Sequence, residues 1–173
     1  MSFKLLSNKV VLKSRVFNVA SQKWSGPEKS TFNRDVVVHP GAVAILPINR
    51  KGEIIMIRQF RPAAEDWLLE IPAGTLEKGE TPLYCAKREL IEEIGFAARK
   101  WKKLGAIYTA PGFCTEKIHL FKAWDLKADF AEKDEDEHIR VVTMPVAKVR
   151  AMVKEGKIND AKSLSALACA GIL

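Results

Sequence analysis

Three glutamates, Glu89, Glu92 and Glu93, lie within one expected turn of helix, directly after Arg88. Residues four apart on a helix project from the same face, and residues three apart nearly so. Like charges at this spacing cost about 0.2–0.5 kcal/mol in water. A divalent cation prefers hard oxygen ligands, so it turns this repulsion into coordination. Taken alone, the cluster is compatible with a metal site or with a solvated acidic surface.

Charge is distributed unevenly along the 173 residues, which carry a net charge of +7. Residues 62–96 hold 3 Lys/Arg and 8 Asp/Glu, whereas residues 1–61 hold 11 and 3, and residues 97–173 hold 14 and 10. An acidic centre with basic flanks suits a cation held by carboxylates beside an anionic substrate. A scattered basic surface is the alternative. Nucleic-acid binding is not expected, because no Lys/Arg run reaches five residues.

The composition, 47% hydrophobic and 28% charged, is typical of a soluble globular protein. No apolar run reaches the roughly 18 residues of a membrane span, and the N-terminal residues lack the pattern of a signal peptide. We therefore expect a cytoplasmic protein with no membrane association. Cys85, Cys114 and Cys169 share no metal-ligand spacing and are expected to be reduced thiols.

The three glutamates share one face only if their segment is helical. The limits of this helix are marked by Thr81 as N-cap, Pro82 at the first position and Gly95 at the end. Leu83, Leu90 and Ile94 are expected to form its buried stripe. A turn is expected over residues 21–30. Alternation and turn residues predict strands over 9–20, 32–39, 41–48, 53–60, 67–74, 101–109, 117–126 and 140–146. Two short helices should follow, and this mixture without βαβ regularity favours an α+β fold or a mixed-sheet α/β sandwich.

The spacing around the glutamates decides between a metal site and a solvated surface. Its fixed positions are Gly74, Glu80, Arg88, Glu89, Leu90, Glu92, Glu93, Gly95 and Phe96. This pattern resembles the signature of the Nudix hydrolase superfamily at every position. The resemblance implies that Glu89, Glu92 and Glu93, with the carbonyl of Ala73, bind Mg²⁺ or Mn²⁺. It also implies a catalytic role for Glu92 and Arg88, with Glu80 supporting the helix and its loop.

The same resemblance implies a fold, a reaction and an assembly. Residues 39–173 are expected to form the Nudix α/β/α sandwich with a mixed β-sheet. Residues 1–38 form a β-rich segment that, in similar proteins, helps to build a homodimer and the partner's site. The implied reaction is attack of water on a phosphorus of a nucleoside diphosphate linked to another group, assisted by divalent cations.

Two features resemble the ADP-ribose pyrophosphatase branch. Pro111, followed by Gly112, lies sixteen residues after the final glycine of the motif. Arg58 and Arg61 precede the apolar lead-in to the motif, where the resemblance implies that Arg61 contacts the diphosphate or the sugar phosphate and that Glu70 lies close to the substrate. Taken alone, Pro-Gly indicates a turn and the arginines indicate charge at a strand edge.

An acidic run over residues 132–137 is a third feature of that branch. The resemblance places Glu135 as general base and Glu137 near the metals, with a solvated acidic loop as the alternative. An aromatic residue that stacks on the nucleobase is not fixed by the motif. Phe17 and Trp24 are the candidates, against ordinary packing.

The expected function is Mg²⁺-dependent hydrolysis of nucleoside diphosphate sugars, with ADP-ribose favoured and AMP and ribose 5-phosphate as products. Hydrolysis of GDP-mannose or of a broad range of nucleotide sugars is the alternative. Hydrolysis of nucleoside triphosphates or RNA caps fits the motif but not Pro111 or the Arg58–Arg61 strand. A non-catalytic Nudix-like module typically lacks motif glutamates, and this chain keeps them all.

Overall fold

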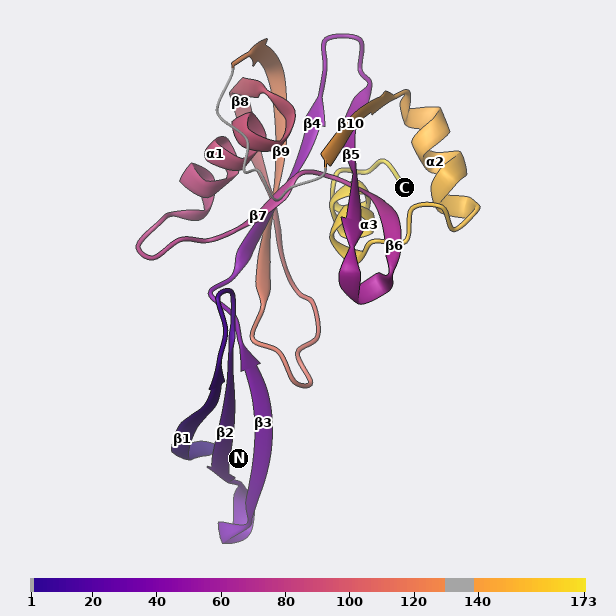
Figure 1. Ribbon diagram of the computed structural model, residues 1–173. Coiled ribbons are helices and arrows are strands. Elements are labelled where there is room, and N and C mark those ends of the chain that lie inside the picture. Colours follow the sequence, from indigo (N-terminus) through magenta and orange to yellow (C-terminus); the bar gives the residue numbers. More distant parts are fainter. Residues whose placement is uncertain (1, 130–138) are drawn as a thin grey trace. The chain divides into compact units, whose positions relative to one another are not determined.

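Figure 1 shows the computed structural model, which describes residues 2–129 and 139–173. Its contacts divide the chain into two units. The first unit comprises residues 1–41 and 108–117, and the second comprises residues 42–107 and 118–173. Within the described ranges, no helix is long and apolar enough to cross a membrane.

The first unit contains an antiparallel sheet of three strands, β1 (Lys4–Lys13), β2 (Asn18–Ser25) and β3 (Thr31–Val38), in the order β1-β2-β3. The single strand expected over 9–20 is wrong, because a turn divides it between β1 and β2. The turn expected over 21–30 is partly wrong, because residues 21–25 belong to β2 and only residues 26–30 form the connection to β3. A turn interrupts the chain after β1, because Ser14 Oγ donates to the carbonyl of Phe17 at 2.8 Å and accepts from its N–H at 3.1 Å. A short 3₁₀ helix, η1 (Pro27–Lys29), joins β2 to β3.

The sheet of the second unit has seven strands: β4 (Ala42–Ile48), β5 (Ile54–Arg61), β6 (Asp66–Glu70), β7 (Ala73–Thr75), β8 (Phe96–Tyr108), β9 (Lys117–Ala128) and β10 (Ile139–Met144). The order is β10-β5-β4-β9-β8, with β6 paired to β5 and β7 paired to β4. The β4–β9 pair is parallel, whereas β5 pairs antiparallel with β4, β6 and β10. The mixed sheet expected from the sequence is confirmed.

Helices cover both faces of this sheet. Successive residues of a strand point to opposite faces, so β4 contributes to a separate hydrophobic cluster on each side. Val43 and Ile45 of β4 join a cluster with α1 (Pro82–Ile94), which we call the α1-side core. Ala44 and Leu46 join a second cluster with α2 (Val146–Lys154) and α3 (Ala161–Cys169), the α2-side core. The α/β/α sandwich predicted from the sequence is confirmed (Figure 1).

The limits of α1 follow the signals in its sequence. Thr81 Oγ1 accepts a hydrogen bond from the Tyr84 N–H at 3.4 Å, Pro82 occupies the first position, and Gly95 ends the helix with φ 72°. The expected buried stripe is partly wrong. Leu83 in the first turn is 40% exposed, and the buried residues of α1 begin at Cys85.

The strand expected over 67–74 is split into β6 and β7. Pro72 has no N–H for a ladder, while its carbonyl accepts from the Ile45 N–H at 2.8 Å. The Ile71 N–H leaves the ladder and donates to Ser163 Oγ of α3 at 2.9 Å. The chain thereby moves from the edge of β5 to β4, where β7 begins at Ala73. A 3₁₀ helix, η2 (Pro62–Ala64), links β5 and β6.

Candidate active site

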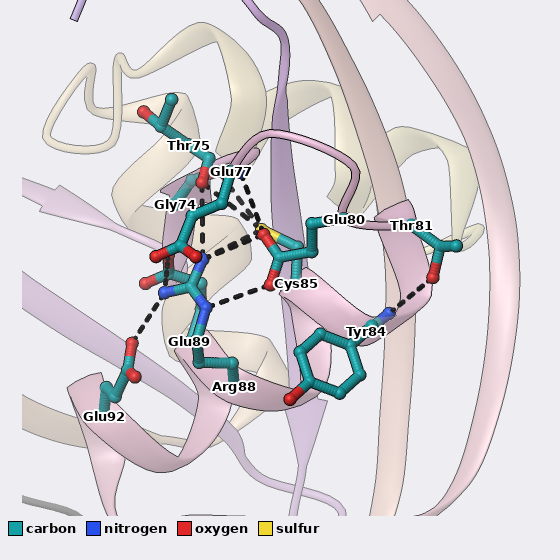
Figure 2. Close-up of polar contacts among 10 residues, drawn as sticks. All are labelled: Gly74, Thr75, Glu77, Glu80, Thr81, Tyr84, Cys85, Arg88, Glu89 and Glu92. Carbon is teal, nitrogen blue, oxygen red and sulfur yellow. Dashed lines mark hydrogen bonds and ion pairs between the residues drawn. The ribbon is translucent and has the colours of Figure 1, made fainter.

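Arg88 joins the acidic residues of α1 to the preceding loop (Figure 2). Its Nε donates to Glu80 Oε1 at 3.0 Å, and its Nη1 donates to Glu89 Oε1 at 2.7 Å and Glu92 Oε2 at 2.8 Å. The hydrogen bond to Glu80 raises the pKa of Arg88 above its ordinary value, against the opposing effect of burial. The same bond lowers the pKa of Glu80. One guanidinium therefore holds three carboxylates in fixed positions.

Glu80 also fixes the loop before α1. Its Oε2 accepts from the Glu77 N–H at 3.0 Å and from Arg88 Nη2 at 3.2 Å. Arg88 Nη2 further contacts the carbonyl of Thr75 at 3.4 Å. The loop, the end of β7 and the middle of α1 are thus tied together by one ion pair.

Two carboxylates of α1 meet the backbone of β7 at Ala73 and Gly74. Glu93 is 3% exposed, and its Oε2 accepts from the Ala73 N–H at 2.8 Å. A Cβ atom at Gly74 would lie 1.8 Å from both Cδ and Oε1 of Glu89. Only glycine lets the carboxylate of Glu89 approach the main chain this closely. The start of β7, at Ala73 and Gly74, is therefore the point on which Glu89 and Glu93 converge.

The Gly74→Ala variant is expected to lose activity about a hundredfold, because the new methyl group displaces the Glu89 carboxylate. Overpacking should also lower the free energy of unfolding by about 1–3 kcal/mol. Turnover and thermal denaturation measure the two effects. Gly112→Ala is the control for stability, since a Cβ there meets no atom within 4 Å. Wild-type turnover in Gly74→Ala would contradict the assigned position of Glu89.

The donor atoms of the three α1 glutamates and of the Ala73 carbonyl are of the kind that a divalent cation such as Mg²⁺ prefers. Three carboxylates, Glu89, Glu92 and Glu93, and the carbonyl of Ala73 supply only hard oxygen ligands. As they stand, Glu89 and Glu92 are bound to Arg88, and in residues 2–129 and 139–173 no three acidic, histidine or cysteine side chains are grouped as a metal site. Coordination would therefore replace hydrogen bonds of Arg88.

A second charged cluster is built on Glu70, which is 1% exposed. Arg61 donates to both of its oxygens, from Nε at 2.9 Å and from Nη2 at 2.6 Å, and Lys162 Nζ bonds Oε2. Burial opposes ionisation of Glu70, but the bonds to Arg61 and Lys162 hold its pKa below the ordinary value. Lys162 also contacts Asp160 Oδ1 at 3.0 Å. The cluster keeps Arg61 charged and oriented.

The cluster on Glu70 is electrostatically coupled to α1. The hydrogen bond to Glu70 raises the pKa of Arg61, burial opposes this, and the charges of Glu70, Glu93 and Asp160 raise the pKa further. Arg61 therefore lies within the field of the Glu93 carboxylate. The sequence singled out Arg61 and Glu70, but it missed Lys162, which is 92 residues from Glu70.

Arg58 and Arg61 lie on opposite faces of β5. Residues 54, 56 and 58 share one face and residues 55, 57 and 61 the other, because the side-chain period of a strand is two. Met56 belongs to the α2-side core and Ile57 to the α1-side core. The structure thus places Arg61 on the α1 side of the sheet and Arg58 on the α2 side, where it lines a separate cavity.

The remaining candidates lie elsewhere. Phe17 is 38% exposed beside the turn between β1 and β2, and Pro111 and Gly112 belong to a loop of the same unit. That loop is bonded to β3, because the Val37 N–H donates to the carbonyl of Phe113 at 2.8 Å. The candidate residues Glu135 and Glu137 lie outside the described residues.

A sequence model of the NUDIX domain matches residues 38–167, which include all the acidic residues of α1 and its loop. The chain belongs to the NUDIX family. Its Nudix resemblance is therefore confirmed. Members of this family generally use a divalent metal ion, in keeping with the oxygen donors at Ala73-Gly74.

Known Nudix relatives match nearly the whole chain. ADP-ribose pyrophosphatase of Bacillus subtilis is 39% identical over 95% of this chain and 90% of its own length. GDP-mannose pyrophosphatase of Cronobacter sakazakii is 35% identical over 93% and 88%. The crystal structure of an ADP compounds hydrolase superposes with a TM-score of 0.87 at 28% identity, covering 99% of this chain and 93% of that one.

Proposed function

We propose that this protein hydrolyses the pyrophosphate bond of nucleoside diphosphate sugars and that ADP-ribose is the favoured substrate. AMP and ribose 5-phosphate would be the products. The observation that carries the proposal is the convergence of the Glu89 and Glu93 carboxylates on Ala73-Gly74, with Arg61 on the same side of the sheet. Relatives that act on ADP-ribose and GDP-mannose support the substrate class.

We further propose Mg²⁺ as the cofactor, with Mn²⁺ as a substitute. Ala73, Glu89, Glu92 and Glu93 would hold it. A cation bound there lowers the pKa of a water molecule and neutralises charge on phosphate oxygens. Arg88 orients Glu89 and Glu92 for this purpose through its two Nη1 bonds.

Glu92 is the acid of α1 most accessible to a reacting water. Its side chain is 37% exposed, compared with 12% for Glu89, while Glu93 as a residue is 3% exposed. We assign it the catalytic role that requires contact with solvent and substrate. A general base from Glu135, with Glu137 beside it, stays a prediction that rests on the family resemblance.

Arg61 is the proposed contact for the diphosphate. Glu70 engages its Nε and Nη2, and its Nη1 has no hydrogen-bond acceptor in the part of the chain that is described. The side chain is 38% exposed. A guanidinium held in this way presents fixed N–H donors to a phosphate oxygen at little further entropic cost.

We also propose that the protein is a cytoplasmic homodimer in which residues 1–38 take part in the interface and in the substrate site. Every residue of β1 is exposed, including Leu5, Leu6, Val11 and Leu12. An exposed apolar edge strand of this length is a liability unless it is covered. On the same proposal, Phe17, Pro111 and Gly112 take part in substrate binding. A measurement of the molar mass in solution tests whether the protein is a dimer.

A panel of nucleotide sugars and nucleoside triphosphates, with products separated by chromatography, tests the proposed function. ADP-ribose should be cleaved far faster than any triphosphate and should release AMP. EDTA should abolish activity, and Mg²⁺ or Mn²⁺ should restore it. GDP-mannose in the same panel ranks the second substrate. If dATP or dGTP gave the best turnover and nucleotide sugars were inert, the proposed substrate class would be wrong.

A further inference from the structure

A cavity of about 480 Å³ lies in the second unit between the sheet and α2. Its apolar lining comes from Leu69 of β6, Val142 and Met144 of β10, and Met152 of α2. Arg58 of β5 and Lys148 of α2 also line it. The volume falls within the roughly 300–1,000 Å³ of small-molecule sites.

This cavity is separated from the candidate active site by the sheet. Met144 is part of the α2-side core together with Val149 of α2. The α1 residues Leu90 and Ile94 belong to the α1-side core on the other face. A ligand in the cavity would therefore occupy a position that the residues at Ala73-Gly74 do not share.

The cavity has an excess of positive charge. Arg58, Lys148 and Lys157 line it, against the single acid Asp66. Lys157 is paired with Glu155 at 2.7 Å. Within residues 2–129 and 139–173, Arg58 and Lys148 have no anionic partner. Two cations thus face a concave surface whose floor is apolar, which is the combination that an amphipathic anion requires.

Trp67 adds a flat aromatic surface to the lining, and its orientation is fixed by its neighbours. The ring of Phe60 packs edge-on at a centroid distance of 5.8 Å, and the guanidinium of Arg140 lies 5.7 Å from the centroid of Trp67. The Trp67 N–H of the main chain donates to Asp66 Oδ1 at 2.7 Å. Trp67 as a residue is 37% exposed, so part of it is accessible to a ligand.

We propose that this cavity is a second binding site, for an anion that combines a planar ring with a phosphate, the chemistry of a nucleoside monophosphate. Arg58 and Lys148 bind the phosphate, and Trp67 with the two methionines contacts the ring. The site does not depend on the metal-binding residues. It also explains why an arginine of the Arg58–Arg61 strand points away from the candidate active site.

Methionine methyl groups provide a direct test. The chain has four methionines, of which Met144 and Met152 line the cavity. Protein labelled with ¹³C at the methionine methyl groups is titrated with AMP in EDTA and without substrate. Saturable shifts are expected at Met144 and Met152, with none at Met1. Adenosine and inorganic phosphate, each lacking one part of the ligand, should bind at least about tenfold more weakly.

Substitutions then test the phosphate contacts. Arg58→Gln and Lys148→Gln should each weaken AMP binding about tenfold or more, since each removes a charge-assisted hydrogen bond. Lys154→Gln, an exposed lysine of the same helix outside the lining, is the matched control and should bind like wild type. Absence of shifts at Met144 and Met152 at millimolar AMP would overturn the proposal, as would wild-type affinity for AMP in both Arg58→Gln and Lys148→Gln.

The titration is independent of the proposed enzymatic function. Glu93→Gln should lose turnover and keep the methyl shifts, because Glu93 lies on the other side of the sheet. Shifts that disappear in Glu93→Gln would assign AMP to the candidate active site and overturn the second site. An enzyme inactive on the whole nucleotide panel that still showed the shifts would refute the proposed function alone.

Discussion

Replacing Glu93 by glutamine is expected to lower kcat by at least about a hundredfold while leaving the fold intact. The amide oxygen of glutamine can still accept the hydrogen bond that Ala73 N–H gives to Glu93 Oε2 at 2.8 Å. The negative charge is lost, and in a residue that is only 3% exposed no solvent compensates for it. The variant therefore separates the electrostatic role of this carboxylate from its structural role.

Steady-state kinetics at saturating Mg²⁺ and the circular dichroism spectrum are the measurements for Glu93→Gln. Glu77→Gln is the matched control, because its side chain is exposed in the loop next to the same helix. It should keep wild-type turnover. Unchanged turnover in Glu93→Gln would remove Glu93 from the metal-binding residues.

The Glu70→Gln variant is expected to lose about 2–3 kcal/mol of unfolding free energy and to bind substrate more weakly. Removing one partner of a buried ion pair costs roughly 3–5 kcal/mol. The loss here is smaller because the Arg61 side chain is 38% exposed and can regain water. Lys162, only 11% exposed, keeps Asp160 as its partner. Substrate binding weakens because Arg61 is no longer held by both carboxylate oxygens.

Denaturant unfolding and KM are the measurements for Glu70→Gln. Glu155→Gln is the control, because its pair with Lys157 is 2.7 Å long but its two side chains are 53% and 63% exposed. It should change stability by less than about 1 kcal/mol. The folded pKa of Glu70 is lowered from 4.5, so its contribution is present above that pH and is lost as the pH falls below it. If the difference in unfolding free energy between Glu70→Gln and wild type does not become smaller at acidic pH, the charge-based explanation is contradicted.

The sequence was most informative where structure is determined locally. Thr81, Pro82 and Gly95 defined α1 because capping and backbone restrictions act within a few residues. The motif also singled out Gly74 and Glu89, although their close approach was seen only in the structure. The first two strands were misplaced because the turn after β1 depends on a hydrogen bond of the Ser14 side chain, which the sequence presents as an ordinary strand residue.

The sequence was less informative about contacts between distant segments. Lys162 reaches Glu70 across 92 residues, and neither position signals the other. Arg58 and Arg61 are three residues apart on a strand, so their side chains project from opposite faces of the sheet. From the sequence, the two arginines were interpreted as one substrate-binding feature, and this rule was not applied to them. Only the structure shows which helices cover each face of the sheet, and this assigns Arg61 to the α1 side and Arg58 to the α2 side.

The parallel pairing of β4 with β9 means that the central part of the sheet cannot form during synthesis until β9 has been translated. Ala42 pairs with Ile118 and Ile48 with Trp124, so β4 lacks this neighbour until most of the chain has been translated. Residues Val43–Leu46 are fully buried in the folded protein. During synthesis they lack their pairing with β9 until β9 has been translated. The acidic helix is translated before β9, yet the sheet on which it packs is still incomplete. A nascent chain that stops before Lys117 would contain the whole sequence motif and still lack the central pairing of its sheet.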